Sequence, residues 1–406
     1  MFEQVRVDRE IFGNGENLLM CGNVMKLPDE IRALAGKAQC VCIDPPFMTG
    51  EKFMRKRPYG EKGWKTGSPS PRYPAYEDRY TNEKAYLRLL HRMITASREL
   101  LQGTGVFYLH LDWRMAAPAR EICNKVFGKT RFLNEIIWSY ESGGRARRYF
   151  SRKHDVILLY ARGKDYHFDL TKVPLPRSEG RRNHMARGKD EQGRMFSRIV
   201  SHGKEYRYYD DEPMYPGDVW ADISHLQQRD PERTGYATQK PIRLLERMLL
   251  PVTEPGDREV DLCCGSGTAL EAAQKLECRF AGMDLNPQAV AVTLNRLKPE
   301  NLKVICPCGT GKAELLVQED AEEKRFELEG LRVKHPAFPA GGTPLDNLES
   351  WEAGTIRDGV FHADMSFRRS FRYPALTQVL RQDPGEIGAV MTTDAAGIRR
   401  AFVREG

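Results

Sequence analysis

The sequence predicts an α/β protein built on a doubly wound, mostly parallel sheet. Strand and helix patterns alternate between residues 239 and 297, and an apolar run at residues 39–43 ends in an acid and two prolines, as a buried parallel strand does at an exposed sheet edge. Between residues 161 and 236, glycine, arginine, proline and aromatic residues mix without a sustained period. We therefore expect an irregular insert that interrupts the regular sheet.

Local patterns predict the individual elements. Short apolar runs predict strands at residues 39–44, 106–111, 134–140, 155–160, 259–263 and 280–284. Apolar residues at helical spacing predict helices at residues 81–101, 241–249, 268–276 and 286–297. Pro241 stands where the first helical turn tolerates proline, and Asn286 is a suitable N-cap.

Four regions follow from these patterns. Residues 1–140 and 237–299 are expected to form two halves of one sheet domain, with residues 141–236 as the insert between them. The first strands of the insert, to about residue 162, can belong to the sheet. After Pro299 the composition changes to proline, glycine and isolated charges, which predicts a small separate C-terminal module at residues 300–406.

The charge is unevenly distributed. The chain has 406 residues and a net charge of +7, and residues 141–207 carry 17 Lys and Arg against 8 Asp and Glu. A solvated surface and contact with a polyanion, most readily nucleic acid, both fit this excess, and charge alone favours the solvated surface. The arginines that we expect to contact a polyanion are Arg145, Arg147, Arg148, Arg181 and Arg182.

The sequence lacks the features that would indicate a membrane protein, a secreted protein or a metal site. No apolar stretch is long enough to span a membrane, and the first residues lack the layout of a secretory signal. The nine cysteines are scattered without metal-site spacing. We expect a cytoplasmic protein with no metal site and no membrane contact.

The run from Asp261 to Thr268 predicts a nucleoside-cofactor site. A strand ends in Asp261, and Gly265-Ser266-Gly267 opens a helix, so a ligand can approach the backbone and the free N–H groups of the helix start. Asp284 ends the next strand, where an acid can accept both hydroxyls of an adenosine ribose. Leu270 replaces the third glycine of a dinucleotide fingerprint, which speaks against NAD.

The tetrad Asp44-Pro45-Pro46-Phe47 follows a buried strand and predicts the reactive site. The two prolines lack N–H groups and stiffen the turn, which leaves nearby carbonyls free to accept hydrogen bonds. Asp44 adds a carboxylate acceptor, and Phe47 offers a stacking face. This cluster fits an exocyclic amine on a flat ring.

With these motifs, the chain resembles the DNA amino-methyltransferases, which transfer a methyl group from S-adenosylmethionine to adenine N6 or cytosine N4. Asp44-Pro45-Pro46-Phe47 matches their catalytic signature, Asp261 to Thr268 their cofactor loop, and Thr238-Gln239-Lys240-Pro241 the motif before that loop. The order of these motifs resembles the β group of the family, in which the insert recognises the target sequence.

The resemblance implies a Rossmann-like fold of the class I methyltransferase type, S-adenosylmethionine as cofactor and double-stranded DNA as partner. It implies that the residues of the Asp44 tetrad are catalytic, and that the cofactor contacts Asp44, Lys240, Asp261, Cys263, Gly265, Ser266, Gly267, Thr268 and Asp284. The sequence departs from the family at Cys263, which stands where an aromatic residue normally lies against the cofactor.

Several functions and partners stay open at this stage. Asp44 before the prolines is the family's usual choice for adenine N6, and cytosine N4 is the first alternative. An RNA or protein-amide methyltransferase and a catalytically silent DNA-binding subunit of a restriction-modification system are the others. A homodimer and a restriction endonuclease subunit are partners that the sequence neither requires nor excludes.

Overall fold

A computed structural model gives the structure of the protein. It describes residues 1–56, 72–141, 145–176, 185–228, 230–297, 300–307, 309, 312–333, 343–369, 376, 379–381 and 384–405. No helix in these ranges is both long and apolar enough to cross a membrane.

Strands dominate the structure. Those in the first part of the chain are β1 (Phe2–Val5), β2 (Arg9–Phe12), β3 (Asn17–Cys21), β4 (Ala38–Ile43), β5 (Lys52–Lys56), β6 (Arg72–Glu77), β7 (Leu101–Asp112), β8 (Phe132–Ser139) and β9 (His154–Ala161). The middle of the chain forms β10 (Ala186–Lys189), β11 (Met195–Ser201), β12 (Lys204–Tyr209), β13 (Val219–Trp220), β14 (Arg258–Asp261) and β15 (Arg279–Asp284). The last are β16 (Leu302–Ile305), β17 (Ala313–Asp320), β18 (Arg325–Val333), β19 (Leu348–Arg357), β20 (Val360–Arg368), β21 (Val379–Arg381), β22 (Ala389–Asp394) and β23 (Arg399–Arg404).

The α-helices lie in the first three quarters of the chain. They are α1 (Asp29–Arg32), α2 (Glu83–Leu100), α3 (Ala116–Phe127), α4 (Ile242–Leu249), α5 (Thr268–Lys275) and α6 (Pro287–Arg296). Asn82 caps α2 by accepting a hydrogen bond from the Ala85 N–H, and Asn286 caps α6 in the same way through the Gln288 N–H.

The centre of the molecule is a run of parallel strands in the order β16-β3-β15-β14-β4-β7. Strand β4 is buried at all six positions, and its side chains alternate between two cores. Cys40 and Cys42 face the core that α4, α5 and α6 cover, whereas Val41 and Ile43 face the core under α2 and α3. Helices therefore cover both faces, which confirms the predicted doubly wound sheet.

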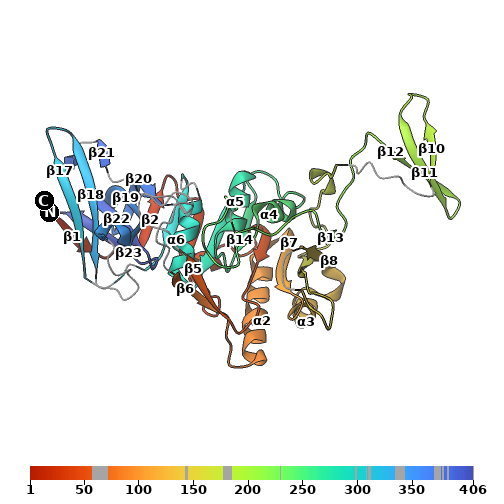
Figure 1. Cartoon of the computed structure of the whole chain (residues 1–406), viewed down its shortest axis with the longest axis horizontal. Coiled ribbons are helices and arrows are strands. Elements are labelled where there is room, and N and C mark those ends of the chain that lie inside the picture. The colour runs from red at the N-terminus through yellow and green to blue at the C-terminus, as the bar shows by residue number, and fades with distance from the viewer. Residues whose placement is uncertain are drawn as a thin grey trace.

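Strands β9, β8 and β13 extend this sheet on one side, with β9 antiparallel to both β7 and β8. Strands β10, β11 and β12 form a separate small sheet that projects from the rest of the molecule at the right of Figure 1. The predicted insert thus contains regular hairpin structure, in addition to the irregular stretches expected from its composition.

The C-terminal strands continue the central sheet on its other side. Strand β20 pairs in parallel with β2, and β1 pairs with β23, so residues 2–12 pack among strands from beyond residue 348. Trp351 lies between Phe326 and Phe367, with ring centroids at 5.9 and 4.5 Å, in a core of its own. The boundary proposed after residue 299 stays a prediction, but the sheet itself is continuous across it (Figure 1).

Candidate active site

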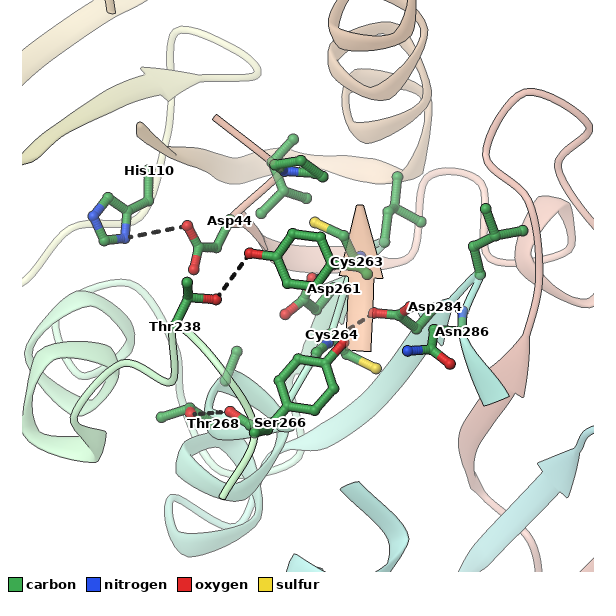
Figure 2. A pocket seen from close by; sticks show the side chains of 18 of the residues that line it. Asp44, His110, Thr238, Asp261, Cys263, Cys264, Ser266, Thr268, Asp284 and Asn286 are labelled. Atoms are coloured by element: carbon green, nitrogen blue, oxygen red, sulfur yellow. Dashed lines mark hydrogen bonds and ion pairs between the residues drawn. The ribbon is translucent and has the colours of Figure 1, made fainter. Parts of the chain in front are cut away.

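A cavity of about 540 Å³ opens at the carboxyl edge of the parallel strands, where β4, β14 and β15 end. Its lining includes these predicted site residues: Asp44, Pro46, Lys240, Asp261, Cys263, Gly265, Ser266, Thr268 and Asp284. Pro45, Phe47 and Gly267 are not part of the lining. The two motifs, more than 200 residues apart in sequence, therefore meet in one pocket of a size that holds small ligands (Figure 2).

The glycine turn between β14 and α5 is shaped by its backbone. Gly267 caps α5 with φ +75°, and a Cβ there would come within 2.6 Å of the Thr293 side chain. Gly265 has φ +51°, and its N–H donates to the Asp284 carboxylate at 2.9 Å. Asp284 also accepts from the Asn286 N–H at 2.8 Å, which fixes the carboxylate at the cavity wall.

Carboxylates outnumber cations in this cavity. Asp44, Asp261 and Asp284 line it, and Lys240 is the only Lys or Arg among the described lining residues. Burial, with a smaller contribution from the Asp44 and Asp284 carboxylates, raises the pKa of Asp261 to about 8. Burial also raises the pKa of Asp284. A cation with hydrogen-bonding hydroxyl groups would relieve this imbalance, and the sulfonium, ammonium and ribose of S-adenosylmethionine fit it.

Asp44 stands between a lysine and a histidine. Its Oδ2 accepts from the Lys240 Nζ at 2.6 Å, whereas its Oδ1 lies 3.7 Å from the His110 Nδ1. That Oδ1 is buried and accepts no hydrogen bond. Lys240 Nζ also lies 5.0 Å from the centre of the Phe47 ring. Figure 2 shows the second carboxylate oxygen of Asp44 directed at the His110 ring.

The turn after Asp44 is fixed by Asp78, a residue that our sequence analysis missed. Asp78 is 1% exposed, and its carboxylate accepts hydrogen bonds from the backbone N–H groups of Phe47, Met48 and Thr49 at 2.8–3.1 Å. Met48 has a φ of +57°, which the three bonds stabilise. A buried acid at the end of a strand is the signal that could have found it.

The β5–β6 hairpin forms one wall of the cavity through Ala75, Tyr76 and Glu77. Tyr76 stacks against Tyr236, with ring centroids 6.4 Å apart, and its hydroxyl bonds to Thr238. On the same hairpin, Arg55 forms a buried ion pair of 2.6 Å with Glu349 of β19, so the C-terminal strands hold this wall from behind. Our sequence analysis assigned no role to these residues.

The loop that joins β8 to β9 carries the predicted DNA-contacting arginines. Arg145, Arg147 and Arg148 are exposed, whereas Arg181 and Arg182 lie outside the described residues. Because β8 runs parallel to β4, this loop lies at the same sheet edge as Asp44. Tyr149 and Phe150 follow these arginines in the same loop, and Phe150 is 98% exposed. The sequence analysis did not identify either aromatic residue as a candidate for DNA contact.

Known proteins resemble this chain over its sheet domain. A family model described as DNA methylase matches residues 38–295, which is more than half of the chain. The type II methyltransferase M.EcaI of Enterobacter cloacae is 24% identical over 306 residues, covering 64% of each chain. The DNA adenine methyltransferase YhdJ of Escherichia coli strain K12 is 23% identical over 70% of this chain and 84% of its own. The chain thus spans slightly less than two thirds of M.EcaI.

Solved structures also match. The complex of M1.HpyAVI with SAM covers 69% of this chain and 99% of its own, with a TM-score of 0.43 and 14% identity. The cytosine-N4-specific PvuII DNA methyltransferase covers 73% of this chain with a TM-score of 0.44 and 13% identity. The family match confirms the resemblance inferred from the motifs and, with it, S-adenosylmethionine as the cofactor.

Proposed function

Since this chain belongs to the DNA methylase family, we propose that it is a site-specific DNA methyltransferase that methylates the exocyclic amine of a base flipped out of the duplex. Adenine N6 is the favoured acceptor, because Asp44 rather than serine precedes the two prolines. The observation that carries the proposal is the buried Oδ1 of Asp44, an acceptor without a donor at the edge of a carboxylate-lined cavity.

The proposed role of Asp44 is to activate the exocyclic amine of the base. Its lone pair is delocalised into the base, so it is a weak nucleophile. Asp44 Oδ1 accepts one N–H and the Pro45 carbonyl accepts the other, which localises the lone pair toward the incoming methyl group. Lys240, at 2.6 Å from Oδ2, holds the carboxylate in one orientation. Phe47 stacks on the flipped base.

The cofactor supplies an electrophilic methyl group when bound. Asp284, fixed by two backbone N–H groups, is placed to accept the ribose hydroxyls, and Asp261 to face the ammonium group. Ser266 and Thr268 are hydrogen-bonded to each other at 3.1 Å at the start of α5 and complete the polar side of the cavity. These residues bind and orient, so the rate gain comes from alignment of donor and acceptor.

The DNA is proposed to lie along the sheet edge above this cavity. Arg145, Arg147 and Arg148 neutralise phosphates, and Phe150 offers an exposed apolar face for the bases next to the flipped one. Sequence choice is proposed to rest on the insert at residues 141–236, including the projecting β10–β12 sheet.

Sequencing of the DNA from cells that express the protein tests this function, with a read-out that identifies both the methylated base and its motif. N6-methyladenine in one motif, absent with Asp44→Ala, is the expected result. N4-methylcytosine would replace the favoured base by the alternative, and unmodified DNA would reject the proposal. Exchange of residues 141–236 with those of a related enzyme should change the motif, and an unchanged motif would place recognition elsewhere.

A further inference from the structure

His110 is a buried histidine behind the free oxygen of Asp44. It lies near the end of β7, is 3% exposed and packs against the rings of Phe47 and Trp138, with centroids at 5.8 and 5.7 Å. Its Nε2 lies 3.1 Å from Asp155 Oδ2, and the other oxygen of Asp155 accepts from the Tyr140 hydroxyl, also at 3.1 Å. The ring is therefore held in one place and one orientation.

The partners of the ring determine its tautomer. Burial opposes ionisation of Asp155, but the hydrogen bond and charge of His110 outweigh it and lower the pKa of Asp155. An ionised Asp155 can only accept, so Nε2 carries the hydrogen. In a neutral ring, Nδ1 then presents a lone pair toward Asp44 Oδ1 across 3.7 Å, and that oxygen has no hydrogen-bond donor.

Methylation of an amine releases a proton. The nitrogen forms a bond to the methyl carbon as the carbon–sulfur bond breaks, and the resulting cationic amine must lose one N–H proton to become neutral. Lys240 already donates to Oδ2 of Asp44 and cannot accept a proton in its charged form. Oδ1 of Asp44 is therefore the proton acceptor proposed to face the amine, and Nδ1 of His110 lies behind it at 3.7 Å.

We infer that Asp44 and His110 act as a pair that takes up this proton, with His110 as the holding site and Asp155 as its stabilising partner. This inference rests on the proposed function. The proton passes from the amine to Oδ1 of Asp44 and on to Nδ1 of His110, which restores the Asp44 carboxylate and makes an imidazolium bonded to Asp155. His110 touches no substrate in this scheme and acts through Asp44. Among the described residues, Asp44 and Asp155 face the ring, and Lys240 and Tyr140 bond to these two carboxylates in turn.

Nitrogen NMR of the histidine rings tests the pair in the full chain without cofactor or DNA. We expect His110 to bind its second proton at Nδ1, and Asp44→Asn to lower the midpoint pH of that step by one unit or more, because it removes a facing charge. His91, exposed on α2, is the matched control whose midpoint should stay constant. An unchanged His110 midpoint in Asp44→Asn would overturn the inference, whether or not the protein methylates DNA.

Single-turnover methylation against pH tests the consequence for the reaction. His110→Asn should lower the plateau rate about 10²-fold and move the acid limb of the profile to lower pH, since Asp44 alone then accepts the proton. Cofactor affinity should change less than twofold, and Asp155→Asn should show the same trend with a smaller loss. Two results would show that His110 only packs in the core and takes no part in proton uptake. One is a lower rate in His110→Asn with the acid limb of the pH–rate profile unchanged, and the other is a His110→Asn rate equal to that of His91→Asn. If the wild-type protein transfers no methyl group to DNA, the proposed function fails, and the NMR result still decides whether the pair exists.

Discussion

Buried charges are arranged differently in the cavity and in the C-terminal strands. Four acids line the cavity (Asp44, Glu77, Asp261 and Asp284) against one described lining lysine, Lys240, which is paired with Asp44, and the other oxygen of Asp44 has no hydrogen-bond donor. Three buried arginines in or against the C-terminal strands have an acid beside them: Arg399 contacts Glu10, Arg400 lies 2.7 Å from Asp394, and Arg55 of β5 lies 2.6 Å from Glu349. Matched charges hold elements together, whereas an unmatched set marks a place where a ligand supplies the missing charge.

The matched pairs should respond most strongly to loss of one partner. Glu349→Ala leaves Arg55 buried without its counter-ion, and we expect a loss of about 3–5 kcal/mol in the free energy of unfolding. Urea denaturation measures it. Arg55→Met combined with Glu349→Leu, which removes both charges, should recover most of the loss. A Glu349→Ala protein as stable as the wild type would show that this pair does not bind the hairpin to the C-terminal strands.

Asp44 is paired with Lys240 at 2.6 Å, but its side chain is 32% exposed, so its loss should affect activity far more than stability. Asp44→Ala should lower methyl transfer by about 10²–10³-fold, because one transition-state acceptor is removed. Transfer of a labelled methyl group to DNA measures the rate, and thermal melting checks the fold. Glu77→Ala is the control, since this cavity acid is already paired with Lys52 at 2.7 Å. Near-normal turnover by folded Asp44→Ala would contradict the assignment.

Asp284 should show the next largest effect, on cofactor binding. Asp284→Ala removes a carboxylate proposed to accept the ribose hydroxyls, and we expect S-adenosylmethionine affinity to fall by about 1.5–3 kcal/mol. Calorimetry with the cofactor alone measures this loss. Asp284→Asn keeps the shape and should lose less. Equal affinity in wild type and Asp284→Ala would mean that the nucleoside binds elsewhere.

Asp261 should make cofactor affinity depend on pH. Its pKa of about 8 means that the carboxyl is mainly protonated at neutral pH in the unliganded chain, so binding of a cation must release a proton. Affinity should therefore rise by up to about tenfold, or 1.4 kcal/mol, per pH unit as the pH approaches 8, and level off above it. The free energy of unfolding of the unliganded chain changes in the opposite direction and falls as the pH rises from about 4 to 8. In this range the Asp261 carboxyl holds a proton in the folded chain but not in the unfolded chain, so raising the pH favours unfolding. Calorimetry at pH 6.5 and 8.5 measures the difference, and Asp261→Asn should remove it.

The parallel strands and the strand-end acids could be predicted from sequence because they depend on local patterns. The run before Asp44 is apolar except at Gln39, and the glycines after Asp261 require a turn. His110 and Asp155 could not be paired from sequence, since they become neighbours only through the antiparallel register of β7 and β9. The sequence also could not show that the C-terminal strands join the central sheet, because the pairing strands β2 and β20 are separated by more than 300 residues.

The anchored hairpin also sets how the cavity can exchange its contents. If outward movement of β5–β6 separates the buried Arg55–Glu349 pair, at a cost of about 4 kcal/mol, the open form is populated in roughly one molecule in 10³. Capture of a ligand through this wall would be slowed by the same factor, which is too rare an opening to serve as the main route. Among the described residues, the strand-end loops, where Leu285 is 70% exposed, are then the expected exit for spent cofactor, and cofactor and DNA would use the same opening.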